Sequence, residues 1–304
     1  MTRREAIGLL GSVSVGTLLA ATNGAGAAIA AESGTQASTG DSPPPLAPGA
    51  PTSPERLRLI AAFKEKSGGL DRRFEARRHK SDWVMPYRLF RPEASGALPL
   101  VMYLHGSGGL GDDNVKQMGL GNIFGTRVWA LPENQKRFPC YVVVPQTDRG
   151  WVRYAAPSAG DSVARMIPGL GDGARLAFEI IDALRRELPI DDRRIYVTGQ
   201  SMGGAGAWHM TAHRRRFFAA AAICCGSPTL DAPADFIGTP VWNFQGDADA
   251  TVPPAISRNR IAALRKAGVR PLSTEYAGVG HNVWEWAFTE PRLPEWMFAR
   301  RRPV

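Results

Sequence analysis

The chain has 304 residues, an apolar content of 44% and a formal net charge of +9. Its positive charge is gathered in short basic runs that lack interleaved aromatic residues and any nucleic-acid motif, which argues against a nucleic-acid partner. A solvated surface with weak affinity for anionic envelope polymers is the simpler interpretation. The runs are Arg72-Arg73, Arg77-Arg78-His79-Lys80, Arg214-Arg215-Arg216 and Arg300-Arg301-Arg302.

Residues 1–30 have the pattern of an export signal. Arg3-Arg4 precedes a moderately apolar stretch, Ile7 to Ala21, and Ala28-Ile29-Ala30 resembles a cleavage site. The paired arginines suggest the twin-arginine route, although Ala6 stands where that signal usually carries an aromatic residue. The apolar stretch is short and rich in glycine, so we expect no stable membrane insertion after cleavage. These features predict a periplasmic or extracellular protein.

Residues 31–54 are dense in Pro, Ser, Thr, Gly and Ala, and they predict a disordered linker. Residues 55–304 remain for the folded domain, a length that suits one domain with a large core. Loss of Arg3, Arg4 and Glu5 with the signal lowers the net charge from +9 to +8, so the mature protein stays basic.

Apolar strands alternate with helices through residues 55–304. The expected strands are Trp83–Phe90, Leu100–Leu104, Tyr141–Val144, Arg194–Thr198, Ala219–Cys224, Val241–Phe244 and Ser273–Tyr276. The expected helices include Glu55–Lys66, Ala174–Glu187, Gly204–His213 and Pro254–Ala267. This alternation predicts an α/β fold with a mainly parallel twisted sheet and helices on both faces. Ligands of such sheets bind beyond the carboxyl ends of the strands.

Two loops in the first half of the domain leave the carboxyl ends of strands. His105-Gly106-Ser107-Gly108-Gly109 has glycines that bring backbone N–H groups close to a developing oxyanion, and we expect the Ser107 N–H to be one donor. His105 then shapes the loop. The second stretch, Gln146 to Gly173, is the longest irregular one. Within it Trp151, and later in the chain Trp284, are candidates for a substrate pocket, with ordinary packing as the alternative for each.

The run Gly199-Gln200-Ser201-Met202-Gly203 follows an apolar strand and precedes a helix of small residues. This Gly-x-Ser-x-Gly context is typical of a nucleophile elbow, in which a serine is held on a tight strand-to-helix turn. The strained turn needs small neighbours, which Gly199 and Gly203 supply. The sequence predicts Ser201 as a nucleophile and the Met202 N–H as the second oxyanion donor.

A base and an acid should follow the serine in the order Ser, Asp or Glu, His. His281 lies in a glycine-flanked loop after the strand Ser273–Tyr276, where the base is expected. Two carboxylates, Asp247 and Asp249, follow the strand Val241–Phe244. We favour Asp249 as the acid because it lies further from the strand, with Asp247 as a turn residue; Asp247 remains the alternative.

The remaining histidines are interpreted as packing or surface residues, and the cysteines as buried thiols. His209 and His213 are four residues apart on one helix, but no nearby acidic third ligand follows, so no metal or other cofactor is expected. Cys140 lies at the start of one predicted strand, whereas Cys224 and Cys225 lie at the end of another. In a parallel sheet these are opposite ends of the strands, too far apart for a disulfide. We therefore expect buried thiols without a disulfide.

These motifs together resemble the α/β-hydrolase-fold serine esterases. The chain is most similar to a secreted group described as predicted peptidases, phospholipase/carboxylesterase-like proteins and feruloyl- or polyhydroxybutyrate-depolymerase-like esterases. The resemblance rests on Pro99–Gly109, Phe138–Gln146, Arg194–Trp208, Gly246–Pro253 and the run that begins at Gly280-His281-Asn282. It implies the same triad, Ser201, Asp249 and His281, and hydrolysis of a small-molecule or polymer ester. A serine peptidase on the same fold and a catalytically idle binding protein are the alternatives.

Overall fold

The computed structural model describes residues 53–155, 166–227 and 230–303. The predicted export signal, residues 1–30, lies outside the described residues. So do most of the predicted linker, residues 31–54, and positions 156–165 of the stretch expected to be irregular.

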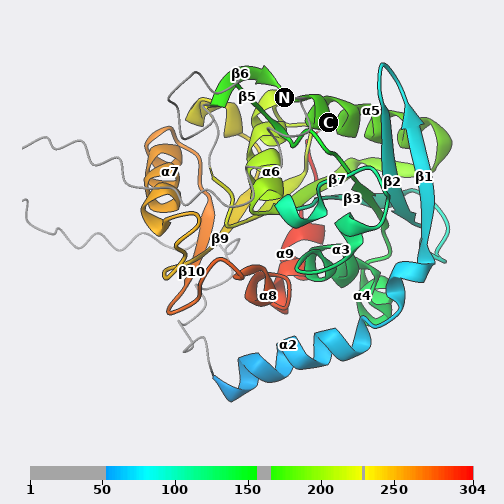
Figure 1. Ribbon diagram of the computed structural model, residues 1–304, viewed down its shortest axis with the longest axis horizontal. Helices are drawn as coiled ribbons and strands as arrows, with labels where there is room; N and C mark the ends of the chain where they lie inside the picture. Colours follow the sequence, from blue (N-terminus) through cyan, green and yellow to red (C-terminus); the bar gives the residue numbers. More distant parts are fainter. Residues whose placement is uncertain (1–52, 156–165, 228–229, 304) are drawn as a thin grey trace, which may run out of the picture.

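Within the described residues, eight strands form one mixed sheet in the order β1-β2-β4-β3-β7-β8-β9-β10 (Figure 1). Neighbouring strands from β4 to β10 are parallel, whereas β1 and β2 add an antiparallel edge. The strands are β1 (Phe74–Lys80), β2 (Val84–Phe90), β3 (Leu98–Leu104), β4 (Tyr141–Pro145), β7 (Ile190–Gln200), β8 (Ala220–Cys224), β9 (Val241–Gly246) and β10 (Leu272–Tyr276). The prediction of a mainly parallel α/β sheet is confirmed.

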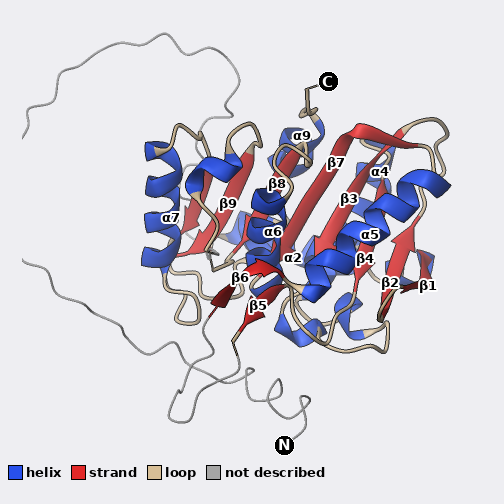
Figure 2. Ribbon diagram, turned by 90° about the horizontal axis from the view of Figure 1, so that it is seen from above, coloured by secondary structure: helices blue, strands red, loops and turns tan. Residues whose placement is uncertain are grey.

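Helices cover both faces of this sheet. They are α2 (Pro54–Lys66), α3 (Asn122–Arg127), α4 (Pro132–Arg137), α5 (Asp172–Glu187), α6 (Met202–His213), α7 (Pro254–Lys266), α8 (Trp284–Ala287) and α9 (Arg292–Phe298). Helices α5, α6 and α7 lie on the face of the sheet turned toward the viewer in Figure 2, and their side chains share one apolar core. Side chains from α2, α3 and α9 contribute to the core on the opposite face.

The central strands are buried on both faces because neither face is left to solvent. In β3, Val101 and Tyr103 belong to the core beneath α2, α3 and α9. Leu100, Met102 and Leu104 of the same strand belong to the core beneath α5, α6 and α7. The two-residue alternation of a strand therefore divides one apolar run between two layers.

The three cysteines lie within this apolar interior, as expected from the sequence. Cys140, Cys224 and Cys225 are buried, free thiols. Burial raises the pKa of the Cys140 thiol to about 12 and that of Cys224 well above its ordinary value. Both groups are therefore neutral thiols at physiological pH.

Several elements were not expected from the sequence. Strand β1 has one buried residue, Phe74, and otherwise carries mostly polar side chains, so it lacks an apolar pattern. The stretch from Gln146 to Gly173 is not wholly irregular, because β5 (Val152–Tyr154) pairs with β6 (Met166–Leu170). Helices α3, α4, α8 and α9 have four to seven residues, too few for a clear helical period.

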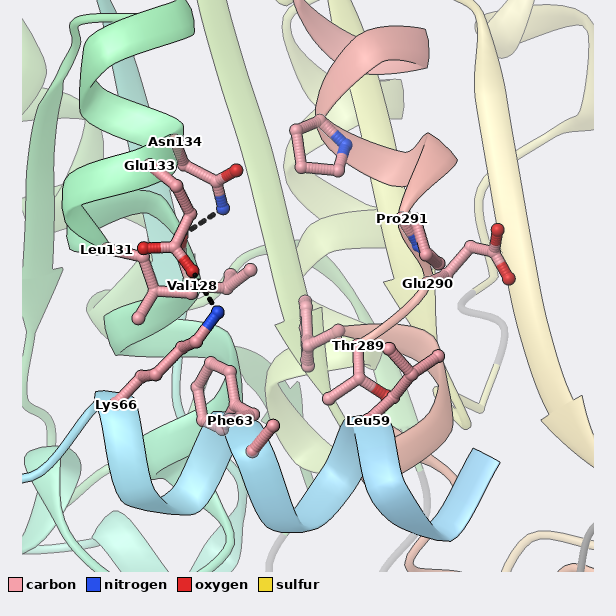
Figure 3. Close-up of a pocket in the computed structure, with 13 residues that line it drawn as sticks. Leu59, Phe63, Lys66, Val128, Leu131, Glu133, Asn134, Thr289, Glu290 and Pro291 are labelled. Carbon is pink, nitrogen blue, oxygen red and sulfur yellow. Dashed lines mark hydrogen bonds and ion pairs between the residues drawn. The ribbon is translucent and has the colours of Figure 1, made fainter. Parts of the chain in front are cut away.

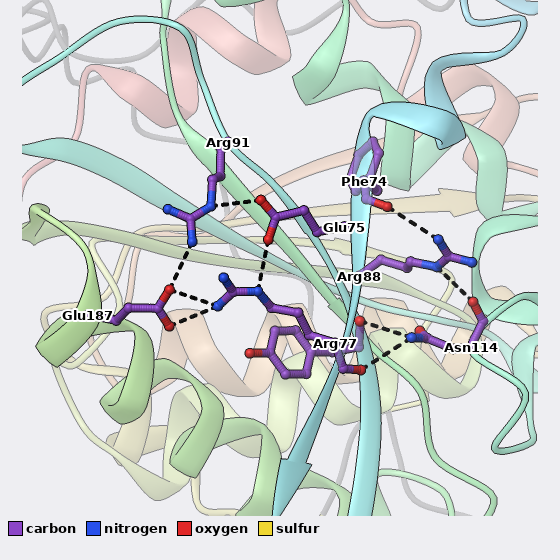
Figure 4. Close-up of polar contacts among 8 residues, drawn as sticks. Phe74, Glu75, Arg77, Arg88, Arg91, Asn114 and Glu187 are labelled. Carbon is purple, nitrogen blue, oxygen red and sulfur yellow. Dashed lines mark hydrogen bonds and ion pairs between the residues drawn. The ribbon is translucent and has the colours of Figure 1, made fainter.

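A network of ion pairs ties the edge of the sheet to α5 (Figure 4). Arg77 of β1 donates to both carboxylate oxygens of Glu187 at 2.8 Å, and Arg91 donates to the same carboxylate at 2.8 Å. Glu75 accepts from Arg77 Nε at 2.9 Å and pairs with Arg91 Nε at 3.0 Å. These side chains are partly exposed, so the network orients the edge strands while each pair contributes under about 1 kcal/mol.

Among the described glycines, Gly203 leaves the least space for a Cβ atom, where α6 meets β3. A Cβ atom on Gly203 would lie 1.9 Å from the Leu104 carbonyl oxygen, and one on Gly199 would lie 2.3 Å from the Gly203 carbonyl oxygen. No side chain fits at either place, so glycine is needed here for close approach. The result is that the start of α6 sits directly on the carboxyl end of β3.

We predict that Gly203→Ala lowers the free energy of unfolding by about 3 kcal/mol, because the clash is with rigid backbone. Gly119→Ala is the matched control, since a Cβ atom there meets its nearest neighbour at 3.8 Å. Urea unfolding of the two variants measures the difference. Equal stability of the two variants would contradict this explanation.

Candidate active site

Ser201 occupies a strained turn between β7 and α6. Its φ is 53° and its ψ is −120°, a conformation that residues other than glycine rarely adopt. The Ser201 N–H donates to the Cys224 carbonyl oxygen at 2.9 Å, which ties the turn to the end of β8. The strand-turn-helix context predicted from the sequence is present, and it turns the serine away from the sheet edge toward the loops that follow β9 and β10.

Three predicted residues meet above the carboxyl ends of the strands. Ser201 Oγ lies 2.8 Å from His281 Nε2, and His281 Nδ1 lies 2.8 Å from Asp249 Oδ2. Asp249 follows β9 and His281 follows β10, so three separate elements bring the groups together. Because the carboxylate accepts from Nδ1, that nitrogen carries the proton and Nε2 is left to accept from the serine hydroxyl.

The Asp249 carboxylate has its hydrogen-bonding capacity filled by the protein. Oδ1 accepts from the N–H groups of Thr251 at 2.9 Å and Val252 at 2.8 Å, while Oδ2 accepts from Gln245 Nε2 at 3.1 Å and from His281. Burial acts to raise the pKa of this carboxyl, but the hydrogen bonds from His281 and the two amides outweigh it and hold the pKa below its ordinary value. A buried anion with four donors is thereby fixed beneath the imidazole.

Asp247, the alternative acid, points elsewhere. Its Oδ1 accepts from the Gly278 N–H at 2.5 Å, which closes the turn after β10, and its side chain is exposed. Of the two candidates, Asp249 is the carboxylate that contacts His281.

Two backbone N–H groups near Ser201 have no acceptor within the part of the chain that the structure describes. A Cβ atom on Gly106 would lie 3.6 Å from Ser201 Cβ, so the glycine-rich loop borders the serine. Asn122 Oδ1 accepts from the Gly106 N–H at 3.1 Å, which occupies that donor. Among the described residues, none accepts from the Ser107 or Met202 N–H. These two were the donors predicted from the sequence, and both remain available to a ligand.

His105 supports the glycine-rich loop from below. Its Nε2 accepts from the Thr147 N–H at 3.1 Å, so Nδ1 carries the proton and donates to the Gly106 carbonyl oxygen at 2.8 Å. Complete burial lowers the pKa of His105 to about 4, although the bond to Gly106 opposes the shift. His105 is therefore neutral near pH 7 and braces the loop, as the sequence indicated.

The two tryptophans proposed for a substrate pocket have different positions. Trp151 has no accessible surface, donates from Nε1 to the His105 carbonyl oxygen at 2.9 Å, and packs against the His105 ring. The prediction that it contacts substrate is therefore wrong, because its indole is enclosed by the loop it holds. Trp284 is partly exposed, and its ring meets His281 edge to face at 5.5 Å.

Amide side chains that the sequence analysis did not single out hold the loops of the site. Gln146 accepts from the Asn114 N–H at 2.5 Å and donates to the Gly109 carbonyl oxygen at 3.1 Å. Asn122 fixes Gly106, and Gln245 donates to Asp249. The sequence signal that could have identified Gln146 is its position directly after β4, at the carboxyl ends of the strands where the site lies.

The remaining histidines lie apart from the triad. His209 is buried on α6 and pairs with Asp231 at 2.9 Å, while His213 is exposed. Among the described residues, one group of three donors is close enough to share a metal, namely Cys225, Asp249 and His281 within 4.8 Å of one another. Asp249 and His281 of this group are already hydrogen-bonded to each other at 2.8 Å.

A separate pocket lies between α2 and the segment from α8 to α9 (Figure 3). Leu59, Phe63 and Val128 supply apolar walls, and Thr289 and Glu290 close the opposite side. None of the predicted catalytic residues lines it. The described helices include no segment that combines the length and the apolar character required to cross a bilayer.

Comparison with solved structures shows the same architecture. The chain is 30% identical to a thermostable esterase over 77% of its own length, with a TM-score of 0.69, and it spans 64% of that protein. It is 17% identical to a ferulic acid esterase, with 74% and 97% of the two chains covered and a TM-score of 0.54. A Pyrococcus horikoshii acylaminoacyl peptidase is 14% identical, with 75% and 42% covered and a TM-score of 0.54.

The fold and the site together define the class of the protein. No family model matches the chain, and no curated protein sequence matches it. The strand order, the elbow and the structural similarities nevertheless identify the chain as a member of the α/β-hydrolase fold, with esterases among the proteins that it resembles. Similarities below 25% identity support this fold alone.

We predict that the free energy of unfolding falls by about 2 kcal/mol between pH 7 and pH 5 through His105 alone. The unfolded state takes up a proton below about pH 6.5, whereas the folded state does so only near pH 4, so acid favours unfolding. Denaturant titrations of the wild type and His105→Gln measure the contribution. In the variant, the free energy of unfolding should fall by about 2 kcal/mol less between pH 7 and pH 5 than in the wild type. The same fall in both proteins would contradict a neutral, buried imidazole at His105.

Proposed function

We propose that the chain is a serine hydrolase that cleaves carboxylic esters through an acyl-enzyme intermediate. The proposal rests on one observation above all: the continuous pair of 2.8 Å hydrogen bonds from Ser201 through His281 to Asp249. The free N–H groups of Ser107 and Met202 beside the serine add a site for an oxyanion. Structural similarity to proteins named esterase gives independent support.

The first half-reaction transfers the acyl group to the enzyme. Ser201 Oγ attacks the ester carbonyl carbon while His281 Nε2 takes the hydroxyl proton. The carbonyl oxygen becomes an oxyanion that accepts from the Ser107 and Met202 N–H groups. As the bond to the leaving oxygen breaks, His281 returns its proton to that oxygen and the alcohol departs. Asp249 stabilises the imidazolium that exists between these two proton transfers.

The second half-reaction repeats these steps with water. Water attacks the acyl carbon, His281 Nε2 accepts the water proton, and the same two N–H groups hold the oxyanion. Collapse of the intermediate breaks the bond to Ser201 Oγ, which recovers its proton from His281. The carboxylic acid leaves, and the resting triad is restored.

We predict that Ser201→Ala lowers kcat for a short p-nitrophenyl ester by about 10⁶-fold, since no nucleophile remains. Asp249→Asn should lower kcat by about 10⁴-fold because it disturbs the imidazole tautomer. Asp247→Asn is the matched control and should stay within about twofold of the wild type. Steady-state kinetics with a thermal unfolding check distinguishes these outcomes. Turnover retained by Ser201→Ala would exclude the mechanism.

The same assay separates ester hydrolysis from the alternatives. A serine peptidase would cleave peptide p-nitroanilides as well as p-nitrophenyl esters, whereas an esterase would cleave the esters and leave the anilides intact. An idle binding protein would turn over neither substrate. We expect ester cleavage to dominate, because no observation within the described residues favours a peptide substrate.

We further propose export to the periplasm or the extracellular space, on the strength of Arg3-Arg4, the apolar stretch that follows and the Ala28-Ile29-Ala30 site. Fractionation of cells that express the full chain tests this proposal. The wild type should be processed and leave the cytoplasm, whereas a chain with Arg3→Lys and Arg4→Lys should stay unprocessed inside. Cytoplasmic wild-type protein of full length would overturn it.

A further inference from the structure

Leu120 is unusual in both its backbone and its exposure. Its φ is 49°, in the left-handed region that favours glycine and asparagine over branched apolar residues. Its side chain is 79% exposed, more than any other large apolar side chain of the described residues. Neither the local backbone nor packing in the core explains a leucine here. Such a position, strained and unburied, suggests a role in function.

Leu120 lies beside the loop that borders Ser201. A Cβ atom on Gly108 would come within 3.7 Å of Leu120 Cδ1, so the leucine side chain stands next to the glycine-rich loop. The short helix α3 begins two residues later, and its Asn122 fixes the Gly106 N–H. Leu120 is thus positioned by the same segment that shapes the proposed oxyanion site.

The residue after Leu120, Gly121, contacts the tryptophan that packs against His281. Gly121 lies against the Trp284 indole, where an added Cβ atom would come within 2.8 Å of Trp284 Nε1. The Trp284 ring in turn meets His281 edge to face at 5.5 Å. The segment Leu120-Gly121 therefore borders both the glycine-rich loop, through Leu120, and the tryptophan next to the base, through Gly121.

We propose that Leu120 and Trp284 form an apolar wall that receives an apolar alkyl or aryl group of the ester and so sets the substrate class. This inference rests on the proposed esterase function and deepens it. Apolar surface exposed beside a reactive serine is covered when a substrate binds, and the gain grows with the apolar area covered. Esters with a longer alkyl or aryl group are therefore preferred over acetates.

The apolar group can belong to either half of the ester, and two substrate series separate these cases. One series lengthens the acyl chain of p-nitrophenyl esters from acetate to octanoate. The other keeps the acyl group as acetate and lengthens a linear alcohol from ethyl to octyl, followed by acid release at constant pH. In one series the wild-type kcat/KM should rise about twofold to fourfold per methylene until the wall is covered.

Leu120→Asn is the informative variant because asparagine suits the left-handed backbone. It should keep the melting temperature of the wild type or raise it, while it flattens the chain-length dependence of kcat/KM. Leu120→Gly gives a second test with the same expectation. Leu57→Ala, which truncates a leucine that is 47% exposed on α2, is the matched control and should keep the wild-type dependence.

Each result decides between the two proposals. A wild type that hydrolyses no ester overturns the esterase function and the wall with it. A wild type that is active without chain-length dependence, or a Leu120→Asn variant that keeps the dependence, overturns the wall alone. Loss of the dependence in Leu57→Ala as well would also overturn it, since the effect would not be local.

Discussion

The contact between the start of α6 and the end of β3 constrains the whole site. Gly203 rests on the Leu104 carbonyl with no space for a side chain, and Gly199 is crowded by Gly203 itself. The intervening Ser201 makes this turn with a positive φ of 53° and a ψ of −120°. The strain at the serine is therefore maintained by packing of backbone against backbone, and the same packing sets the height of the hydroxyl above the sheet. The loops that complete the site are built around this fixed point.

The remaining groups are held by polar contacts suited to a dry interior. Asp249 is kept ionised by two amides, Gln245 and His281, whereas His105 is kept neutral by burial between two backbone groups. The two residues have opposite requirements, because in the proposed mechanism Asp249 stabilises a positive charge on His281 whereas His105 only supports a loop. Trp151 also supports the glycine-rich loop, because its Nε1 donates to the His105 carbonyl oxygen. The charge states and hydrogen bonds of Asp249 and His105 are thus preorganised in the protein without a ligand.

The sequence predicted those parts of the fold and site that depend on short local patterns. Seven of the eight strands of the main sheet and four long helices were predicted from apolar runs and their period, and the order Ser201, Asp249, His281 was predicted from motifs at strand ends. Strand β1 escaped detection because its side chains are mostly polar, and Trp151 was misassigned because exposure is not encoded locally. Asn122 and Gln146 act through contacts with distant backbone groups, which no spacing in the chain reveals.

The central claim is that Ser201 is an activated nucleophile, and covalent labelling measures this most directly. The intact protein would be treated with a fluorophosphonate and digested, and the modified peptide identified by mass spectrometry. We expect one phosphonyl group per chain, on Ser201, with labelling that slows strongly in Asp249→Asn but not in Asp247→Asn. Absence of label on Ser201, or equal rates in the two aspartate variants, would contradict the proposed triad.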